Sequence, residues 1–382
     1  MIQSKLPNVG TTIFTVMSKL AAEHKALNLG QGFPGFPMDM QLGALVEGYI
    51  RKGFNQYAPM QGVIELRKIL SEKIASMYGH RYDADSEITI TAGGTQAIYT
   101  AITALVHSDD EVILFAPAYD CYAPAIELNG GKPVWINLTY PDFKINWNDV
   151  RKLVNHKTKM IIINTPHNPS GACMPAEDML ELEKIVAGSD IFVLSDEVYE
   201  HIVFDGNQHQ SVARYPTLAS QSFTVFSFGK TFHNTGWKMG YICGPAAMMA
   251  EFRKVHQFNV FSCNTPVQYA LAEYLQQEER YLQLPIFYEE KRNVFLNAIQ
   301  SSSFEVVPSP GTYFQLLGYK SLSEEKDTDM AIRLTRDYGI ASIPCSVFYP
   351  GNHDDKVLRF CFAKENEDLM RAGEILSAVK KM

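Results

Sequence analysis

Two lysines, Lys230 and Lys238, lie in the stretch SFGKTFHNTGWKMG, residues 227–240. Lys230 follows the apolar run SFTVFSF, so we expect it at the end of a buried strand, where an unpaired ammonium is costly. A lysine in that setting is either paired with a carboxylate or used as a nucleophile with a lowered pKa. Lys238 is framed by Gly236 and Gly240, so the chain can turn it toward the same site.

Two glycine-containing turns follow other predicted strands. Gly94, Thr95 and Gln96 come after EITIT, and the free N–H groups of a helix start suit an anion such as phosphate. An ordinary turn with two glycines has the same sequence pattern. Asn168 lies in PHNPSG, where two prolines and a glycine fix a rigid turn that aims its amide in one direction. That turn either presents a ligand-binding amide or is only capped by it.

An acidic group follows a further apolar run. Asp196 comes directly after IFVLS, and it is either a cap or a buried charge that awaits a cationic partner. Tyr199 lies three residues later and is placed to reach the same side. Because ligands of open α/β sheets collect at the carboxyl ends of the strands, we expect these groups to lie together.

The elements that position these groups are seven short apolar runs with helical patterns between several of them. The predicted strands cover residues 87–91, 111–116, 132–138, 159–165, 191–197, 222–228 and 240–244, and helices are predicted over 96–106, 176–187 and 246–257. Near-continuous apolar strands that alternate with helices indicate a largely parallel sheet covered on both faces. The sequence therefore predicts an α/β fold.

The length of 382 residues favours two packed domains, because a single core rarely grows so large. Helical patterns over 266–302, the run FEVVPSPGTYFQLLGY and the run KVLRFCFA are typical of a smaller α+β unit. The first 45 residues lack strand and helix alternation, and we expect them to wrap onto one of the two domains. We assign 1–45 to an N-terminal arm and part of the small domain, 46–284 to the large domain and 285–382 to the small C-terminal domain.

Composition argues against several classes of function. The net charge of −8 with scattered basic residues disfavours nucleic-acid binding, and no apolar run is long enough to span a membrane. The N-terminus has no signal-peptide pattern, so we expect a cytoplasmic protein. The six cysteines are widely spaced without a C-x-x-C pair, which predicts reduced thiols and no zinc site.

Two further patterns are treated as decoys. His353, Asp354 and Asp355 have metal-ligand chemistry, but adjacent side chains do not converge on one ion, so we predict a polar turn and no metal. GQGFPG, residues 30–35, matches a dinucleotide fingerprint letter for letter. Its prolines favour an extended or turn conformation where that fingerprint needs a helix start.

The succession AGGTQA, NTPHNPSG, SDEVYE, SFGKTFHNTGWKMGY and LRFCFA resembles the pyridoxal-phosphate-dependent aminotransferases of fold type I, class I. The resemblance covers essentially the whole chain, with five motifs in the family's order. LNLGQGFPGFP and PAYDCY further resemble the branch that includes glutamine, kynurenine and methionine aminotransferases. The resemblance implies a large domain that binds pyridoxal phosphate on a mainly parallel seven-stranded sheet between helices, a smaller α+β domain, and a homodimer with shared active sites.

The same resemblance implies a role for each polar group around the cofactor ring. Lys230 would hold pyridoxal phosphate as a Schiff base and later move the proton of the substrate Cα. Asp196 would pair with the pyridinium nitrogen and keep the ring protonated. Asn168 and Tyr199 would hydrogen-bond the ring oxygen, and Tyr119 would stack on the ring.

For the cofactor phosphate, the resemblance implies donors from the turn at residues 94–96, from the stretch 227–240 and from the neighbouring subunit. These donors would be Gly94, Thr95, Gln96, Ser227, Lys238 and the neighbouring subunit's copy of Tyr57. Much of the family carries arginine where this chain has Lys238. Lysine offers a point charge in place of a bidentate fork, which leaves the effect on phosphate affinity open.

For the substrate, the resemblance implies that Arg359 grips the α-carboxylate with help from the Gly32 N–H and from Asn168. A surface arginine on a strand is the alternative. Phe14 is expected near the substrate side chain. Residues 258–265 resemble the segment that the partner subunit contributes, and they lack the arginine of enzymes that act on aspartate or glutamate.

These points predict transfer of the amino group of an apolar or amide amino acid to a 2-oxo acid by a ping-pong mechanism. An acidic substrate is disfavoured because its buried side-chain carboxylate would lack a partner. Among the apolar and amide substrates we favour methionine, followed by phenylalanine, glutamine and kynurenine. A carbon–sulfur β-lyase on the same fold is the alternative. A regulator with a DNA-binding domain is disfavoured by the short N-terminal segment, and His233 is expected only to pack.

Overall fold

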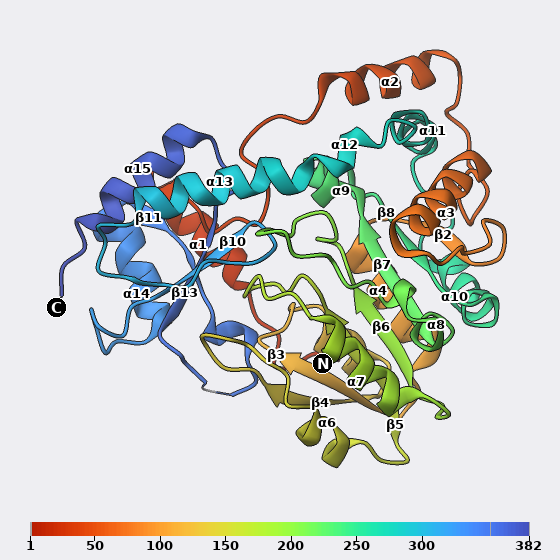
Figure 1. Cartoon of the computed structure of the whole chain (residues 1–382), viewed down its shortest axis with the longest axis horizontal. Helices are drawn as coiled ribbons and strands as arrows, with labels where there is room; N and C mark the ends of the chain where they lie inside the picture. The colour runs from red at the N-terminus through yellow and green to blue at the C-terminus, as the bar shows by residue number, and fades with distance from the viewer. Residues whose placement is uncertain (1, 352, 382) are drawn as a thin grey trace.

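The computed structural model describes residues 2–351 and 353–381, and its centre is a seven-stranded sheet (Figure 1). The strands lie in the order β2-β8-β7-β6-β5-β3-β4, and β8 runs antiparallel to both of its neighbours while the other pairs are parallel. Their bounds are β2 (Ile88–Thr91), β3 (Glu111–Ala116), β4 (Lys132–Asn137), β5 (Thr158–Asn164), β6 (Phe192–Asp196), β7 (Ser222–Ser227) and β8 (Gly240–Cys243). Each coincides with a predicted strand, which confirms the α/β fold.

Both faces of this sheet are covered by helices. Within β5, Ile161 belongs to the core on one face and Ile162 to the core on the other, as the alternation of a strand requires. One face carries α4 (Gly94–Leu105), α5 (Tyr122–Leu128) and α10 (Ala246–Asn259), and the other carries α6 (Trp147–Leu153), α7 (Ala176–Val186) and α8 (Pro216–Ala219). The predicted helices over 96–106, 176–187 and 246–257 are α4, α7 and α10.

The C-terminal part forms a separate antiparallel sheet with the strand order β12-β13-β10-β9 (Figure 1). Its strands are β9 (Glu305–Val306), β10 (Phe314–Gly318), β12 (Ile343–Pro344) and β13 (Val357–Cys361), and its helices are α13 (Leu284–Ala298), α14 (Asp327–Arg333), which continues as one π turn to Tyr338, and α15 (Asn366–Ser377). Helices α13 and α15 pack against each other. This is the smaller α+β unit that the sequence predicts.

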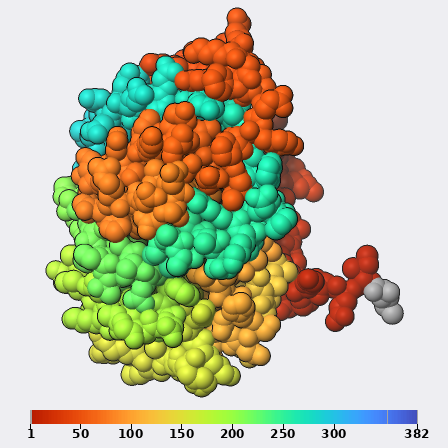
Figure 2. Space-filling model, turned by 90° about the vertical axis from the view of Figure 1, so that its right-hand side faces the viewer, coloured from red at the N-terminus to blue at the C-terminus, as the bar shows by residue number. Residues whose placement is uncertain are grey.

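The N-terminal segment contacts both units, whereas we expected it to wrap onto one. Its elements are α1 (Ile13–Glu23), β1 (Leu27–Asn28) and α2 (Met40–Arg51). Strand β1 pairs in parallel with β11 (Ile340–Ala341) of the C-terminal part, while α2 packs on α11 (Thr265–Tyr274). Figure 2 shows α2 and α3 (Ile64–Tyr78) in orange beside α10 and α11 in green and cyan. The domain limits at residues 45 and 284 stay a prediction.

Three further short elements are present, two between β7 and β8 and one before the C-terminal unit. Helix α9 (Phe228–Thr231) follows β7 directly, the turn Thr235–Trp237 leads into β8, and α12 (Glu279–Leu282) precedes α13. The carboxyl ends of β5, β6 and β7 face the C-terminal sheet, and the residues that follow these strands lie between the two. Within residues 2–351 and 353–381, no helix combines the length and the apolar character needed to cross a bilayer.

Candidate active site

A cavity of about 440 Å³ lies where the ends of the parallel strands meet the C-terminal unit. All of the predicted site residues except Gln96 and Tyr57 line it. They are Phe14, Gly32, Gly94, Thr95, Tyr119, Asn168, Asp196, Tyr199, Ser227, Lys230, Lys238 and Arg359. Residues that are far apart in the sequence therefore form one site.

Lys230 is held in this cavity by two oxygen acceptors. Its Nζ donates to the hydroxyl of Tyr313 at 2.9 Å and to the carbonyl of Gly32 at 3.0 Å. Burial lowers the pKa of Lys230 to about 8, and the positive charge of Arg359 adds to that lowering. A lysine with this pKa is a neutral nucleophile in a far larger fraction of molecules at neutral pH than an ordinary lysine.

Asp196 ends β6 as a buried carboxylate, with only 4 % of its surface exposed. Oδ2 accepts from the hydroxyl of Tyr122 at 2.5 Å, and Oδ1 accepts weakly from the backbone of Val198 at 3.4 Å. Burial raises the pKa of Asp196 to about 6, against the lowering effect of Tyr122. In the described part of the chain, no basic side chain pairs with Asp196, so the alternative of a plain ion pair with Lys230 is wrong.

Arg359 is buried on β13 and is therefore no surface arginine. Nη1 donates to Oδ1 of Asn168 at 2.8 Å and Nη2 donates to the carbonyl of Gly30 at 3.2 Å, while the guanidinium stacks 4.0 Å from the ring centre of Phe314. Nε has no partner among the described residues. Two of the five N–H donors of this arginine are thus used, and each terminal nitrogen, Nη1 and Nη2, keeps a second N–H that has no partner among the described residues.

A second anion site lies at the start of α4. Gly93 is the N-cap residue at φ 82° and leaves the first N–H groups of the helix without a side-chain cap. No described acceptor takes the backbone N–H groups of Gly94, Thr95 or Gln96. A Cβ at residue 93 would lie 3.5 Å from Nζ of Lys238, so this ammonium sits against the helix start. Free N–H groups and a lysine together favour a phosphate.

Two predicted residues lie outside the cavity. The NH₂ group of Gln96 donates to Thr100 of α4 and to Asn259 of α10, so only the backbone N–H of Gln96 is free for an anion. Tyr57 is 82 % exposed and packs edge-on against Phe261, 5.4 Å between ring centres. Its expected role depends on a second subunit and stays a prediction.

Sequence reasoning missed Tyr313, Tyr122 and Phe314, which hold Lys230, Asp196 and Arg359. Tyr313 and Phe314 lie in GTYFQ, which carried only a strand signal, and Tyr122 lies in PAYDCY beside the predicted stacking residue Tyr119. The rings of Tyr119 and Tyr122 pack edge to face at 5.8 Å.

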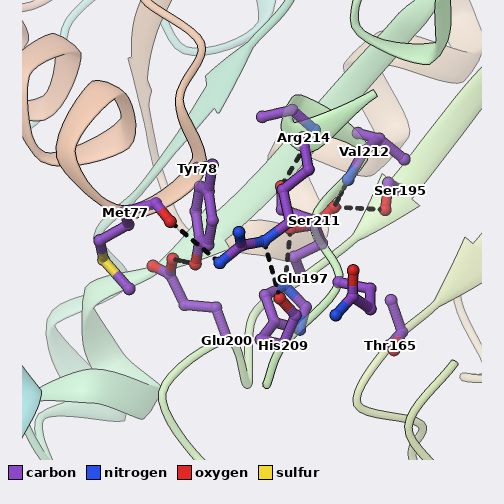
Figure 3. Close-up of polar contacts among 12 residues, drawn as sticks. Met77, Tyr78, Thr165, Ser195, Glu197, Glu200, His209, Ser211, Val212 and Arg214 are labelled. Carbon is purple, nitrogen blue, oxygen red and sulfur yellow. Dashed lines mark hydrogen bonds and ion pairs between the residues drawn. The ribbon is translucent and has the colours of Figure 1, made fainter. Parts of the chain in front are cut away.

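The turn that carries Asp196 and Tyr199 is also held by the carboxylates of Glu197 and Glu200, which do not line the cavity. Figure 3 shows these two carboxylates among their polar contacts. Glu197 accepts from His209 at 2.8 Å, and Glu200 pairs with Lys73 at 2.6 Å. Burial alone would raise the pKa of Glu200, but Lys73 holds it below its usual range. Buried pairs of this kind favour one arrangement of the turn.

Comparison with known proteins identifies the class of enzyme to which the chain belongs. Residues 24–376 match the family of class I and II aminotransferases, so the chain belongs to this family and is a pyridoxal-phosphate-dependent aminotransferase of fold type I. The buried carboxylate without a cation, the amine of lowered pKa and the anion site at α4 fit the ring nitrogen, the aldehyde and the phosphate of this cofactor.

Individual relatives match over their whole length. Methionine aminotransferase of Escherichia coli is 48 % identical over 98 % of this chain and 97 % of its own, and a kynurenine–oxoglutarate transaminase of Dictyostelium discoideum is 34 % identical over 97 % and 95 %. A crystal structure from Escherichia coli, reported as a methionine aminotransferase, superposes with a TM-score of 0.97 at 48 % identity and covers 99 % of each chain. An aspartate aminotransferase of Thermus thermophilus superposes at 0.90 with 25 % identity, covering 99 % of each chain.

Proposed function

We propose that this aminotransferase transfers the α-amino group of methionine to a 2-oxo acid by a ping-pong mechanism. The observation that supports methionine most is the 48 % identity to Escherichia coli methionine aminotransferase over nearly the whole chain. Phe14, Phe33 and Phe314 line the cavity, and Arg359 is the only arginine among its described lining residues. An apolar side chain fits this wall better than a second carboxylate does.

When bound, pyridoxal phosphate supplies an aldehyde that condenses with amino groups and a ring that accepts the electron pair left on the substrate Cα. Asp196 keeps the ring nitrogen protonated through a buried charge pair. Lys230 would hold the cofactor through its amine, and the same amine, when free, would take the proton from the substrate Cα. A pKa of about 8 suits Lys230 both to accept that proton and to return it near neutral pH.

Arg359 orients the substrate through its α-carboxylate, using donors that Asn168 and Gly30 leave free. Gly32 borders the same place, because a Cβ at residue 32 would lie 3.8 Å from Nη2 of Arg359. The amide oxygen of Asn168 accepts a hydrogen bond from Arg359, so its NH₂ group would donate to the ring oxygen, beside Tyr199.

The cofactor phosphate is assigned to the start of α4. The backbone N–H groups of Gly94, Thr95 and Gln96 would hold it, together with Ser227 and Lys238, which line the same cavity as Gly94 and Thr95. Tyr119 covers the ring, and its hydroxyl lies 3.1 Å from Oγ1 of Thr95.

We also propose a cytoplasmic homodimer. Three aromatic residues are exposed, Tyr57 by 82 %, Phe258 by 90 % and Phe261 by 40 %; Tyr57 packs against Phe261 and lines a surface hollow of about 630 Å³. Exposed apolar groups of this kind favour a protein partner. The six cysteines are unpaired, as expected for a reducing compartment.

The test of substrate choice compares kcat/KM for methionine and aspartate with the same 2-oxo acid. We expect methionine to be favoured at least about a hundredfold, because a buried carboxylate without a partner costs about 3 kcal/mol or more. Faster turnover of aspartate would contradict the proposal. The relatives give no support to the carbon–sulfur lyase alternative.

A further inference from the structure

The GQGFPG loop, residues 30–35, is held by three basic side chains, two buried and one half-buried, that donate to its carbonyl oxygens. Arg359 donates to Gly30 at 3.2 Å, Lys230 to Gly32 at 3.0 Å and Lys364 to Phe33 at 3.0 Å. Three of the four carbonyl groups of residues 30–33 thus accept from basic side chains of the two larger units.

Two of these three contacts compete with catalysis. Lys230 reacts with the cofactor and Arg359 binds the substrate carboxylate, so both side chains have another partner during turnover. Lys364 does not line the cavity. Its contact with Phe33 is therefore available whether or not cofactor and substrate are bound.

Lys364 is buried against the loop, with its ammonium beside Phe33. Its residue is 6 % exposed, its ammonium lies 5.0 Å from the ring centre of Phe33, and no described carboxylate pairs with it. The next backbone group, Gly35 N–H, donates to the carbonyl of Ala363 at 2.8 Å. A Cβ at residue 35 would lie 3.0 Å from Cδ of Lys364, so the loop packs tightly on the lysine stem. Burying an ammonium without a carboxylate is costly, and the loop is its main compensation.

We propose that Lys364 is a positioning residue for substrate binding. By donating to the carbonyl of Phe33 and packing its stem on Gly35, it fixes the backbone of Gly32 beside Arg359, where the Gly32 N–H would meet the substrate α-carboxylate. This inference rests on the proposed function of Gly32 and Arg359.

Lys291 provides a matched control. Its ammonium also lies against the end of this segment, 5.4 Å from the ring centre of Phe36, and its side chain is 12 % exposed. Lys291 donates to Asn366 at 3.0 Å and lies 3.8 Å from Glu365, and it donates to no loop carbonyl. Lys364→Met and Lys291→Met remove the same charge from neighbouring places while each keeps an apolar stem.

The experiment measures KM and kcat for methionine, and the dissociation constant of deamino-methionine from the holoenzyme. Deamino-methionine carries the carboxylate and the thioether but no amino group to transfer. For Lys364→Met we expect KM and the dissociation constant to rise about tenfold, as for a lost hydrogen bond to a charged group, with kcat within about twofold. Hydrogen exchange at the amide of Gly35 should accelerate, and Lys291→Met should change none of these values.

Gly35→Ala disturbs the same contact from the loop side without changing Lys364. It should shift KM and the dissociation constant in the same direction, which provides a second variant that is independent of the buried lysine. Unchanged deamino-methionine binding in Lys364→Met, or an equal loss in Lys291→Met, would overturn the inference.

The Arg359→Met variant distinguishes a wrong role of Lys364 from a wrong assignment of the carboxylate site. If Arg359→Met abolishes deamino-methionine binding while Lys364→Met leaves it unchanged, only the role of Lys364 is wrong. If Arg359→Met binds deamino-methionine as the unaltered protein does, the proposed carboxylate site itself is wrong.

Discussion

Replacing Lys230 by alanine is expected to lower kcat for methionine by at least about four orders of magnitude. The variant loses the amine that binds the cofactor covalently and the group that moves the Cα proton, and proton transfer alone accounts for about 10²–10⁴ in rate. Lys238 cannot substitute, because its ammonium lies against Gly93 at the start of α4. The measurement is steady-state transamination together with retention of cofactor during gel filtration.

Lys238→Met is the contrasting variant from the same stretch of sequence. It should weaken cofactor binding through the phosphate and recover most of its kcat at saturating cofactor. The Lys230→Ala protein should still take up cofactor reversibly through Asp196 and the anion site at α4. Normal turnover by Lys230→Ala would remove the assignment of Lys230 as the reacting lysine.

Replacing Asp196 by asparagine should slow single-turnover conversion of methionine by about two to four orders of magnitude. The change breaks a buried charge pair with the ring nitrogen, which costs about 3–5 kcal/mol, and a tenfold change corresponds to about 1.4 kcal/mol. Asparagine has the same shape and can still accept from Tyr122, so packing is preserved. Stopped-flow absorbance of the holoenzyme mixed with methionine measures this rate.

Glu200→Gln is the matched control, since it neutralises a buried carboxylate on the same turn. Glu200 accepts from Tyr78 at 2.5 Å (Figure 3), as Asp196 accepts from Tyr122, yet Glu200 does not line the cavity. It should lower the free energy of unfolding through the loss of its charge pair with Lys73, with a small effect on the single-turnover rate. Equal rates for Asp196→Asn and the unaltered protein would contradict the role of Asp196.

The fold was largely predictable because the strands of the central sheet are buried on both faces. A strand such as β5 is then a nearly continuous apolar run, which is visible in a single sequence. Neither helix α1 nor strand β1 was predicted from the sequence. Helix α1 has a recognisable Thr12 cap that accepts from Thr15, whereas β1 has only two residues and exists through its pairing with β11. Such short strands depend on tertiary contacts that no local pattern records.

The site was predictable where a motif carries the chemistry, as for Lys230 and Asp196. It was not predictable where a residue acts through another element. Tyr313 lies 83 positions from the lysine that it holds, and Asn168 lies 191 positions from Arg359. The side chain of Gln96 is taken up by other partners, because its amide oxygen accepts from the backbone N–H of Ala92 at 3.0 Å and its NH₂ group donates to Asn259 of α10, a contact that no local pattern records.

The most direct test of the proposed reaction mixes the holoenzyme with L-methionine in the absence of any 2-oxo acid. We expect the absorbance of the lysine-bound cofactor to give way to that of pyridoxamine phosphate, with release of the 2-oxo acid of methionine in an amount that matches the active sites. An unchanged cofactor spectrum, or continuous release of ammonia from methionine, would contradict amino-group transfer from methionine at this site.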